Sequence, residues 1–321
     1  MASKTRKKSH IGNHLLLLPP TMKDFASCLS EHAVKVSDTS CSGSSGHSSV
    51  LENKSVQSAV TCLYRSRLST LKELLIRVTW SKSHVGPALC IGVDDNPSLH
   101  DWKPTSMNSH LLRKKKGSES YALGTSLIDL RWDISSAKYG PGPEPIEDFY
   151  VVVIVDAHFG LLLGDMSRDY IERFEEKIPI AEFSMFSRRE QVLGHSFYST
   201  NARFREGGRD HEITIRCKEP DGWDSKESEL SVCIDKKRVV HVRKLRWNFR
   251  GNQTIFIDGT PVDMMWDLHD WWFSSPSGGY AAFMFRTRSA LESRLWLEEE
   301  ILRKEQGISG FSLLIQAFKS F

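Results

Sequence analysis

The sequence lacks every common catalytic signature. It contains no P-loop, no G-x-S-x-G nucleophile elbow, no H-E-x-x-H metalloprotease motif and no G-x-G-x-x-G dinucleotide-binding loop. We therefore expect no catalytic residues and no cofactor. The sequence favours a protein that is not an enzyme, although an enzyme with an unfamiliar kind of site stays open.

Cysteine pairs and long apolar runs are also missing. The six cysteines include no C-x-x-C pair and match no zinc-site spacing, so we expect free thiols in a reducing compartment and no bound metal. The main apolar run, Tyr150–Val155, is far shorter than the ~20 residues of a membrane-spanning helix, so no transmembrane segment is expected.

The excess of positive charge is small, a net +3 over 321 residues. A dedicated duplex-DNA binder usually carries a heavier and more clustered charge, so nucleic acid is not an expected partner. The hydrophobic content of 40% and the charged content of 26% are ordinary for a globular protein, and the length suffices for two domains.

Residues 1–57 differ in composition from the rest of the chain. Ser37–Ser49 is small and polar, which predicts a flexible N-terminal arm. Apolar residues between Phe25 and Val36 recur at helical spacing, so a short helix there is a candidate docking element for a protein partner. Since the chain start is basic and its first acidic residue is Asp24, a plastid transit peptide stays open beside a cytoplasmic or nuclear location.

A short pattern occurs twice in the chain. Placing Gly117 on Gly251 brings Trp132 onto Trp266 without a gap, at a constant offset of 134 residues (251 − 117). The same alignment superposes Asp129 on Asp263 and Asp133 on Asp267, and further along Phe183–Phe186 resembles Phe311–Leu314. The repeat predicts two copies of one structural unit.

Alternating apolar and polar residues from Ser58 onward predict strands in both copies. A helix is expected after Asp165 or Ser167 and another from Ser289, each followed by a final strand. We therefore predict an all-β, mainly antiparallel protein. It would consist of two similar β-barrel or β-sandwich units in tandem, residues 58–194 and 195–321, each with one helix before its last strand. Sheet closure, and whether the two units share one core, are left open.

Several runs of the chain resemble one plant family. They are Leu245–Phe256, Arg113–Ser118, Trp132–Lys138, Ser187–Glu190, Phe283–Arg286 and the Trp266–Trp271 segment. These runs are similar to the family catalogued as domain of unknown function 868, and the similarity extends from about Asp24 to the C-terminus. The resemblance implies a plant source; it implies no activity and brings no functional residues.

The segment Asp263–Phe273 is the first candidate for a ligand site. A strand would place Asp267, His269 and Trp271 on one face, where a carboxylate beside a histidine suits proton transfer and tryptophan suits stacking on a planar ligand. The ligand-binding candidates are therefore Trp266, Asp267, His269 and Trp271. The alternative is structural, because the first copy has Ser135 in place of His269. A core tryptophan with a carboxylate that caps a backbone turn would explain the shared pair equally well.

The basic run Lys236–Arg250 is the second candidate. On a strand expected over Arg238–Phe249, the cations of Lys244, Arg246 and neighbouring Arg250 would share one face. The anion-binding candidates are Lys244, Arg246 and Arg250, with Lys114 and Lys115 as their counterparts in the first copy; phosphates of lipid or nucleic acid would be the ligands. A solvated face, or edge lysines that block sheet aggregation, is the alternative.

Three functions therefore stay open. The leading one is a non-catalytic binding or scaffold protein, because the repeated framework is apolar and aromatic and gathers no catalytic set. The second is a carrier of, or an enzyme acting on, a small apolar ligand held in a barrel cavity. The third is binding of phosphate or an anionic surface through the basic strands.

Overall fold

The computed structural model describes residues 56–83, 86–95, 109–173, 178–194, 196–205, 207–218, 228–274, 279–288 and 310–319. The expected N-terminal arm lies outside this part except for its last two residues, which already belong to the first strand. The helix expected from Ser289 also lies outside it.

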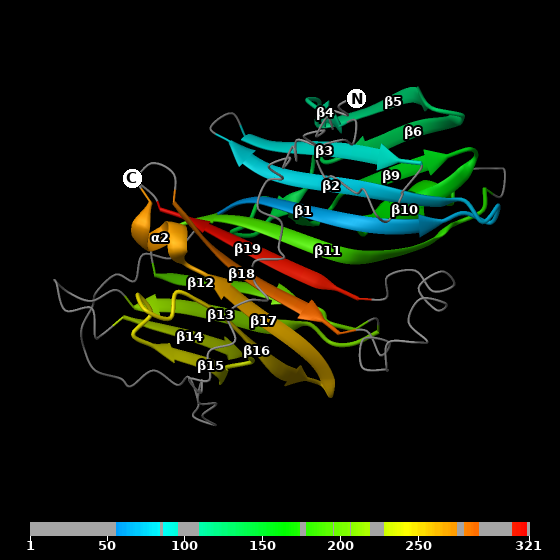
Figure 1. The fold of residues 1–321 in the computed structure, drawn as a ribbon. Helices are drawn as coiled ribbons and strands as arrows, with labels where there is room; N and C mark the ends of the chain where they lie inside the picture. Colours follow the sequence, from blue (N-terminus) through cyan, green and yellow to red (C-terminus); the bar gives the residue numbers. More distant parts are fainter. Residues whose placement is uncertain are drawn as a thin grey trace, which may run out of the picture.

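One nine-stranded sheet extends through the molecule, in the order β16-β17-β18-β19-β11-β1-β2-β3-β4 (Figure 1). In chain order its strands are β1 (Val56–Arg67), β2 (Glu73–Ser83), β3 (Gly86–Asp94), β4 (Ser109–Leu112), β11 (Glu182–Leu193), β16 (Arg250–Ile257), β17 (Thr260–Asp267), β18 (Tyr280–Thr287) and β19 (Ser312–Phe318). Its centre is β11, which pairs antiparallel with β1 and parallel with β19.

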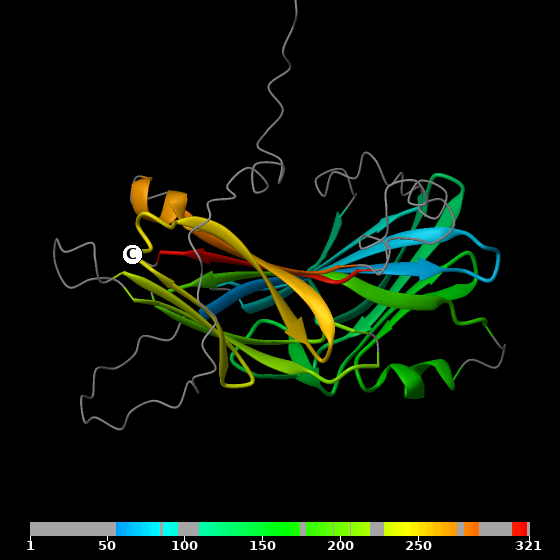
Figure 2. The same cartoon turned by 60° about the horizontal axis from the view of Figure 1, so that its bottom comes forward.

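Two four-stranded sheets pack against this large sheet (Figure 2). One has the order β10-β9-β6-β5, with β5 (Lys116–Leu123), β6 (Ser126–Asp133), β9 (Tyr150–Val155) and β10 (His158–Leu163). The other has the order β12-β13-β14-β15, with β12 (Phe197–Ala202), β13 (His211–Lys218), β14 (Glu229–Ile234) and β15 (Lys237–Arg243). A separate two-stranded sheet consists of β7 (Lys138–Tyr139) and β8 (Pro145–Glu147).

Each four-stranded sheet forms a sandwich with its half of the large sheet. We call the sandwich with β1–β4 the first lobe and the sandwich with β16–β19 the second lobe. Both small sheets lie on the same face, because Val60, Glu190 and Ile315 are register partners on adjacent strands of the large sheet and all three are buried. The described sheets are open, so the closed-barrel alternative is wrong, and both halves share the nine-stranded sheet.

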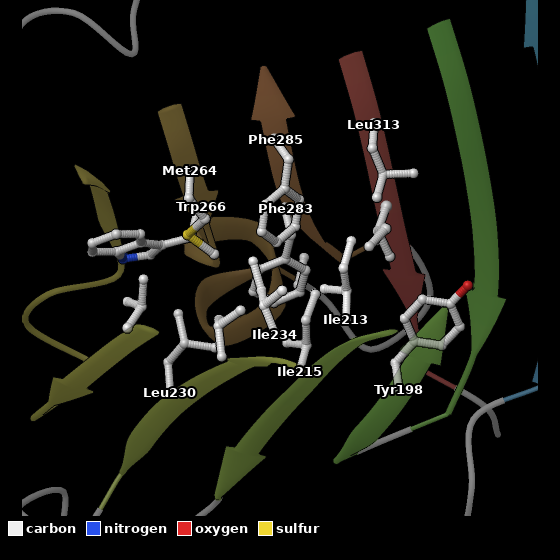
Figure 3. Close-up of a cluster of buried hydrophobic side chains, with 14 of the residues drawn as sticks. Tyr198, Ile213, Ile215, Leu230, Ile234, Met264, Trp266, Phe283, Phe285 and Leu313 are labelled. Atoms are coloured by element: carbon white, nitrogen blue, oxygen red, sulfur yellow. The ribbon is translucent and has the colours of Figure 1, made fainter. Parts of the chain in front are cut away.

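The lobes have separate apolar cores. The first core contains Ile76 and Trp132, and the second contains Ile215 and Trp266. Figure 3 shows the second core, where Ile213, Ile215 and Leu230 of the small sheet face Met264, Trp266, Phe283 and Phe285 of the large sheet. These side chains alternate along their strands with exposed or half-buried ones, which is the pattern that made the strands predictable.

The repeated pattern corresponds to two hairpins with the same register. Gly117 pairs with Trp132 in β5–β6, and Gly251 pairs with Trp266 in β16–β17. Each indole lies over its glycine, where an added Cβ would overlap the ring. Each indole N–H also donates to a backbone carbonyl at the same offset: Trp132 to Lys114 at 2.9 Å and Trp266 to Asn248 at 3.0 Å. The glycine is therefore required because the ring occupies the space of its side chain.

The helices depart from expectation. In the first lobe α1 (Ser167–Ile171) comes before β11 as predicted, but neither expected cap is made. Asp165 instead accepts the backbone N–H groups of Asp148 and Phe149, and Ser167 Oγ donates to a carbonyl. The second helix, α2 (His269–Phe273), lies where a continuing strand was read, so the expected alternation beyond Asp267 is wrong.

Candidate functional site

A cleft of about 1780 Å³ lies where the two lobes meet. Its lining comes from β1 and β11 of the large sheet, from the whole of β12, and from the segment that joins β7 to β8. That segment contains Gly140, Pro141 and Gly142, and its proline content suits a stiff wall. No sequence motif pointed to this cleft, because its walls come from parts of the chain as far apart as Val56 and Phe311.

A completely buried carboxylate lies in this region, Glu190 on β11. Arg188, two residues earlier on the same strand face, places its Nε 2.6 Å from Glu190 Oε1. Thr200 on β12 donates its hydroxyl to the same oxygen at 2.8 Å, and Tyr198 donates its phenol O–H to the other oxygen. Arg188 also reaches Glu144 at 2.8 Å. The network therefore ties β12 of the second lobe to the central strand and to the cleft wall.

The other titratable groups here are held in their protonated forms. Burial raises the pKa of the Cys62 thiol to about 12, so this cysteine is a poor nucleophile near neutral pH. Burial, followed by the charge of Glu190, raises the pKa of Tyr198, which keeps its phenol a hydrogen-bond donor. Since both oxygens of Glu190 are already engaged, the arrangement is suited to positioning rather than to proton transfer.

The strand β12 presents a free edge to the cleft. It is the outermost strand of its sheet, with β13 as its only ladder partner among the described strands. Cys217 N–H donates to Ser196 O, so these two residues form a hydrogen-bonded pair of the antiparallel ladder. Every second residue of β12 from Ser196 therefore faces β13 with its backbone groups. The N–H and C=O groups of the residues between them, Phe197, Ser199 and Asn201, point away from β13. All three residues line the cleft.

The cleft side chains are aromatic and cationic. Phe183, Phe186 and Phe197 supply apolar surface. Arg65 lies over the Phe186 ring at 5.8 Å, and neither Arg65 nor Arg205 has a carboxylate partner in the part of the chain described. An extended ligand with apolar and acidic groups would complement this lining.

The predicted ligand candidates lie elsewhere, at the end of β17. Trp266 is only 2% exposed, and Trp271 on α2 is buried as well. Asp267 accepts the backbone N–H of His269 at 2.9 Å and pairs with Arg250 at the same distance. This is the turn-capping role that the structural alternative expects. His269 is half-exposed beside Asp270.

The predicted anion candidates are joined by a turn rather than a strand. The strand β15 ends at Arg243, Lys244 has a positive φ of 52°, and β16 begins at Arg250. The expected strand through Phe249 is therefore wrong beyond Arg243. The turn nevertheless brings Lys244, Arg246 and Arg250 to the same end of the second lobe as Asp267 and His269. Lys114 and Lys115 are exposed in the equivalent turn of the first lobe.

A second buried polar group is His211 in the second lobe. Its Nδ1 lies 2.8 Å from Asp235 and its Nε2 lies 2.9 Å from Asp258, so one ring joins the tips of two hairpins. Burial opposes the charge of both aspartates, but hydrogen bonds from His211 and the nearby charge of Arg209 outweigh it. The pKa of each carboxyl is therefore below its ordinary value.

Acid is expected to weaken the contacts of His211 with Asp235 and Asp258, and so to lower the stability of the fold. A carboxyl group whose pKa is lowered in the folded protein stabilises the fold at pH values above its unfolded pKa of about 3.9. This stabilisation is lost as the pH falls through the lower pKa of the folded state. The free energy of unfolding, measured in urea, should therefore fall below about pH 4, and Asp235→Asn should flatten that fall. Asp169→Asn, at an exposed position outside these contacts, serves as the control. Equal acid slopes for wild type and Asp235→Asn would contradict the assignment.

In the described residues, no group of three or more histidine, cysteine or acidic side chains is arranged to hold a metal ion. No helix in this part of the chain is long and apolar enough to cross a membrane. Among known families, the model described as plant protein of unknown function (DUF868) matches residues 55–319. No curated protein and no solved structure matches the chain.

Proposed function

Because the chain belongs to the plant family of unknown function DUF868, we propose a function from its own geometry. The protein is a non-catalytic binding protein that takes an extended polypeptide segment into the cleft between its lobes. The observation that carries this proposal is the free edge of β12 along one wall of the cleft. The proposal is a specific form of the binding or scaffold role expected from the sequence.

The size of the cleft supports a polypeptide over a small molecule. Small-ligand pockets usually enclose roughly 300–1,000 Å³, and this cleft is larger at about 1780 Å³. The interior of the second lobe, by contrast, holds packed side chains (Figure 3), and buried apolar side chains also form the core of the first lobe. This packing does not favour a carrier with an apolar cavity inside a lobe.

The backbone of β12 supports binding by strand addition. An exposed edge offers unpaired N–H and C=O groups at alternate residues, and an incoming strand pairs with them in register. The network of Glu190 with Tyr198 and Thr200 holds β12 in place before any ligand arrives. Such preorganisation lowers the entropic cost of binding.

The proposed strand addition is tested by removing one backbone N–H donor from β12. Ser199→Pro removes the N–H that faces the cleft, and an edge strand tolerates proline where that N–H points outward. Peptides selected from a random display library on the full chain, fluorescently labelled, are the probe. We expect Ser199→Pro to weaken binding by about tenfold, since one lost backbone hydrogen bond and the steric block of the ring act together.

The matched control is Asn252→Pro on β16, the outer strand at one end of the nine-stranded sheet. Asn252 is exposed, and the ladder alternation points its N–H away from β17. Peptide affinity should be unchanged in this variant. Failure to select any peptide, or equal affinity of selected peptides for wild type and Ser199→Pro, would contradict the proposal.

We also propose that the lobes derive from one duplicated unit, with residues 58–194 and 195–321 as its copies. The shared hairpin register and the two equivalent indole–carbonyl bonds support this. The copies are used differently, because β5–β6 lies in a small sheet and β16–β17 in the large one. A partner site on the N-terminal arm stays a prediction.

A further inference from the structure

A turn at the end of the second lobe exposes large aromatic side chains among cations. Trp247 is 78% exposed and Phe273 on α2 is 57% exposed. Phe249 links them: it lies in the same turn as Trp247, and its ring centroid is 5.6 Å from that of Phe273. We call Lys244, Arg246, Trp247, Phe249 and Phe273 the Trp247 surface.

The turn that carries Trp247 is rigidly built. Leu245 is fully buried and its N–H donates to Ser228 O at 3.1 Å. The N–H groups of Trp247 and Asn248 both donate to Lys244 O, and Asn248 O accepts the indole N–H of Trp266. The exposed indole therefore projects from a fixed base, and its exposure is not the result of a loose loop.

The equivalent turn of the first lobe shows that this fold does not require aromatic residues here. At the repeat offset, Arg113 stands in the place of Trp247 and Lys115 in the place of Phe249, and both are exposed. Trp132 still makes the same bond to the turn, to Lys114 O. Phe249 packs partly against the second core, but Trp247 is exposed. Since the turn forms with a cation in the place of Trp247, the stability of the turn does not explain this exposed indole.

The charges beside the aromatic rings are partly uncompensated. Arg250 pairs with Asp267, and Arg243 lies 3.9 Å from Glu229. Lys244 and Arg246 have no carboxylate partner in the described part of the chain. Arg246 lies over the Trp272 ring at 5.2 Å, and its Nε has no acceptor there.

We propose that the Trp247 surface binds anionic lipid membranes reversibly. Indole rings favour the headgroup region of a bilayer, where the apolar body and the N–H are both accommodated, and nearby lysine and arginine attract anionic headgroups. The surface projects from a turn and shares no residue with the lining of the cleft, which suits shallow insertion into a membrane. This site is separate from the cleft and does not depend on its proposed role.

The experiment is co-sedimentation of the full chain with vesicles of phosphatidylcholine, with or without phosphatidylserine. Binding is expected only with phosphatidylserine and should fall with added salt. Lys244→Gln should weaken binding about fivefold, the effect of one surface cation. Trp247→Arg, which installs the residue of the first lobe, should weaken binding roughly tenfold despite its added charge, because the inserted indole is lost.

Phe256→Ala is the matched control, since Phe256 is 74% exposed on β16 but lies outside the Trp247 surface. This variant should bind like wild type. Three results would each overturn the proposal: no sedimentation with either vesicle, equal binding to both vesicles, or a Trp247→Arg variant that binds as tightly as wild type. The first of these would direct attention to a protein partner for the same surface.

Discussion

Replacing Glu190 by alanine is expected to lower the free energy of unfolding by about 3–5 kcal/mol. The variant leaves Arg188 largely buried with only the half-exposed Glu144 to balance its charge. It also removes the acceptor for the hydroxyl groups of Tyr198 and Thr200. Breaking a buried ion pair from one side is costly because the remaining charge stays out of water.

The measurement is equilibrium unfolding in urea followed by circular dichroism. Glu190→Gln should show a smaller loss, since the amide oxygen still accepts hydrogen bonds while the negative charge is gone. Glu182→Ala, at the exposed start of the same strand, is the control and should stay within about 0.5 kcal/mol of wild type. A loss below about 1 kcal/mol for Glu190→Ala would mean that the network does not join the lobes as described.

Removing either repeated tryptophan should have an effect of similar size. Trp132→Ala and Trp266→Ala each empty a large volume of one core, which typically costs about 3–5 kcal/mol. Because one nine-stranded sheet passes through both lobes, we expect the described body to unfold in a single transition. Each variant should therefore shift that same transition, although the two cores share no buried residue.

Unfolding followed in parallel by tryptophan fluorescence and far-ultraviolet circular dichroism tests this expectation, since coincident curves indicate a two-state process. Trp247→Ala is the control, because its indole is exposed and contributes little to either core. Two separate transitions, with Trp266→Ala shifting only one, would show that the lobes fold independently. The parallel pairing of β11 with β19 would then be a weak contact.

The two hairpins β5–β6 and β16–β17, each with its paired glycine and tryptophan, are the part of the fold that could be predicted in most detail. The constant offset between Gly117 and Gly251 reflects a local rule, since the indole of the paired residue on the neighbouring strand occupies the glycine's side-chain space. Such a rule acts within about twenty residues and leaves a trace in one sequence. The all-β class was predictable for the same reason, because alternation reports which face of each strand is buried.

The turn at Lys244 and the helix α2 escaped prediction for an opposite reason. Arg238–Phe249 and Asp263–Phe273 both alternate well enough to resemble strands. In the structure the positive φ of Lys244 and the bond from His269 N–H to Asp267 end the strands, and neither follows from alternation. As a consequence Trp271 is buried, while Trp247, which no pattern singled out, is exposed.

The sequence by itself determined the strands, their buried faces and the repeated hairpin with its tryptophan, because these depend on neighbours along the chain. Only the tertiary structure decided that β11 and β19 pair in parallel, that two sandwiches share one sheet, and that Glu190 is buried beneath β12. The pairings of β11 with β1 and with β19 join residues more than a hundred positions apart. Their pairing is selected by the packing of whole sheets, which local periodicity does not encode.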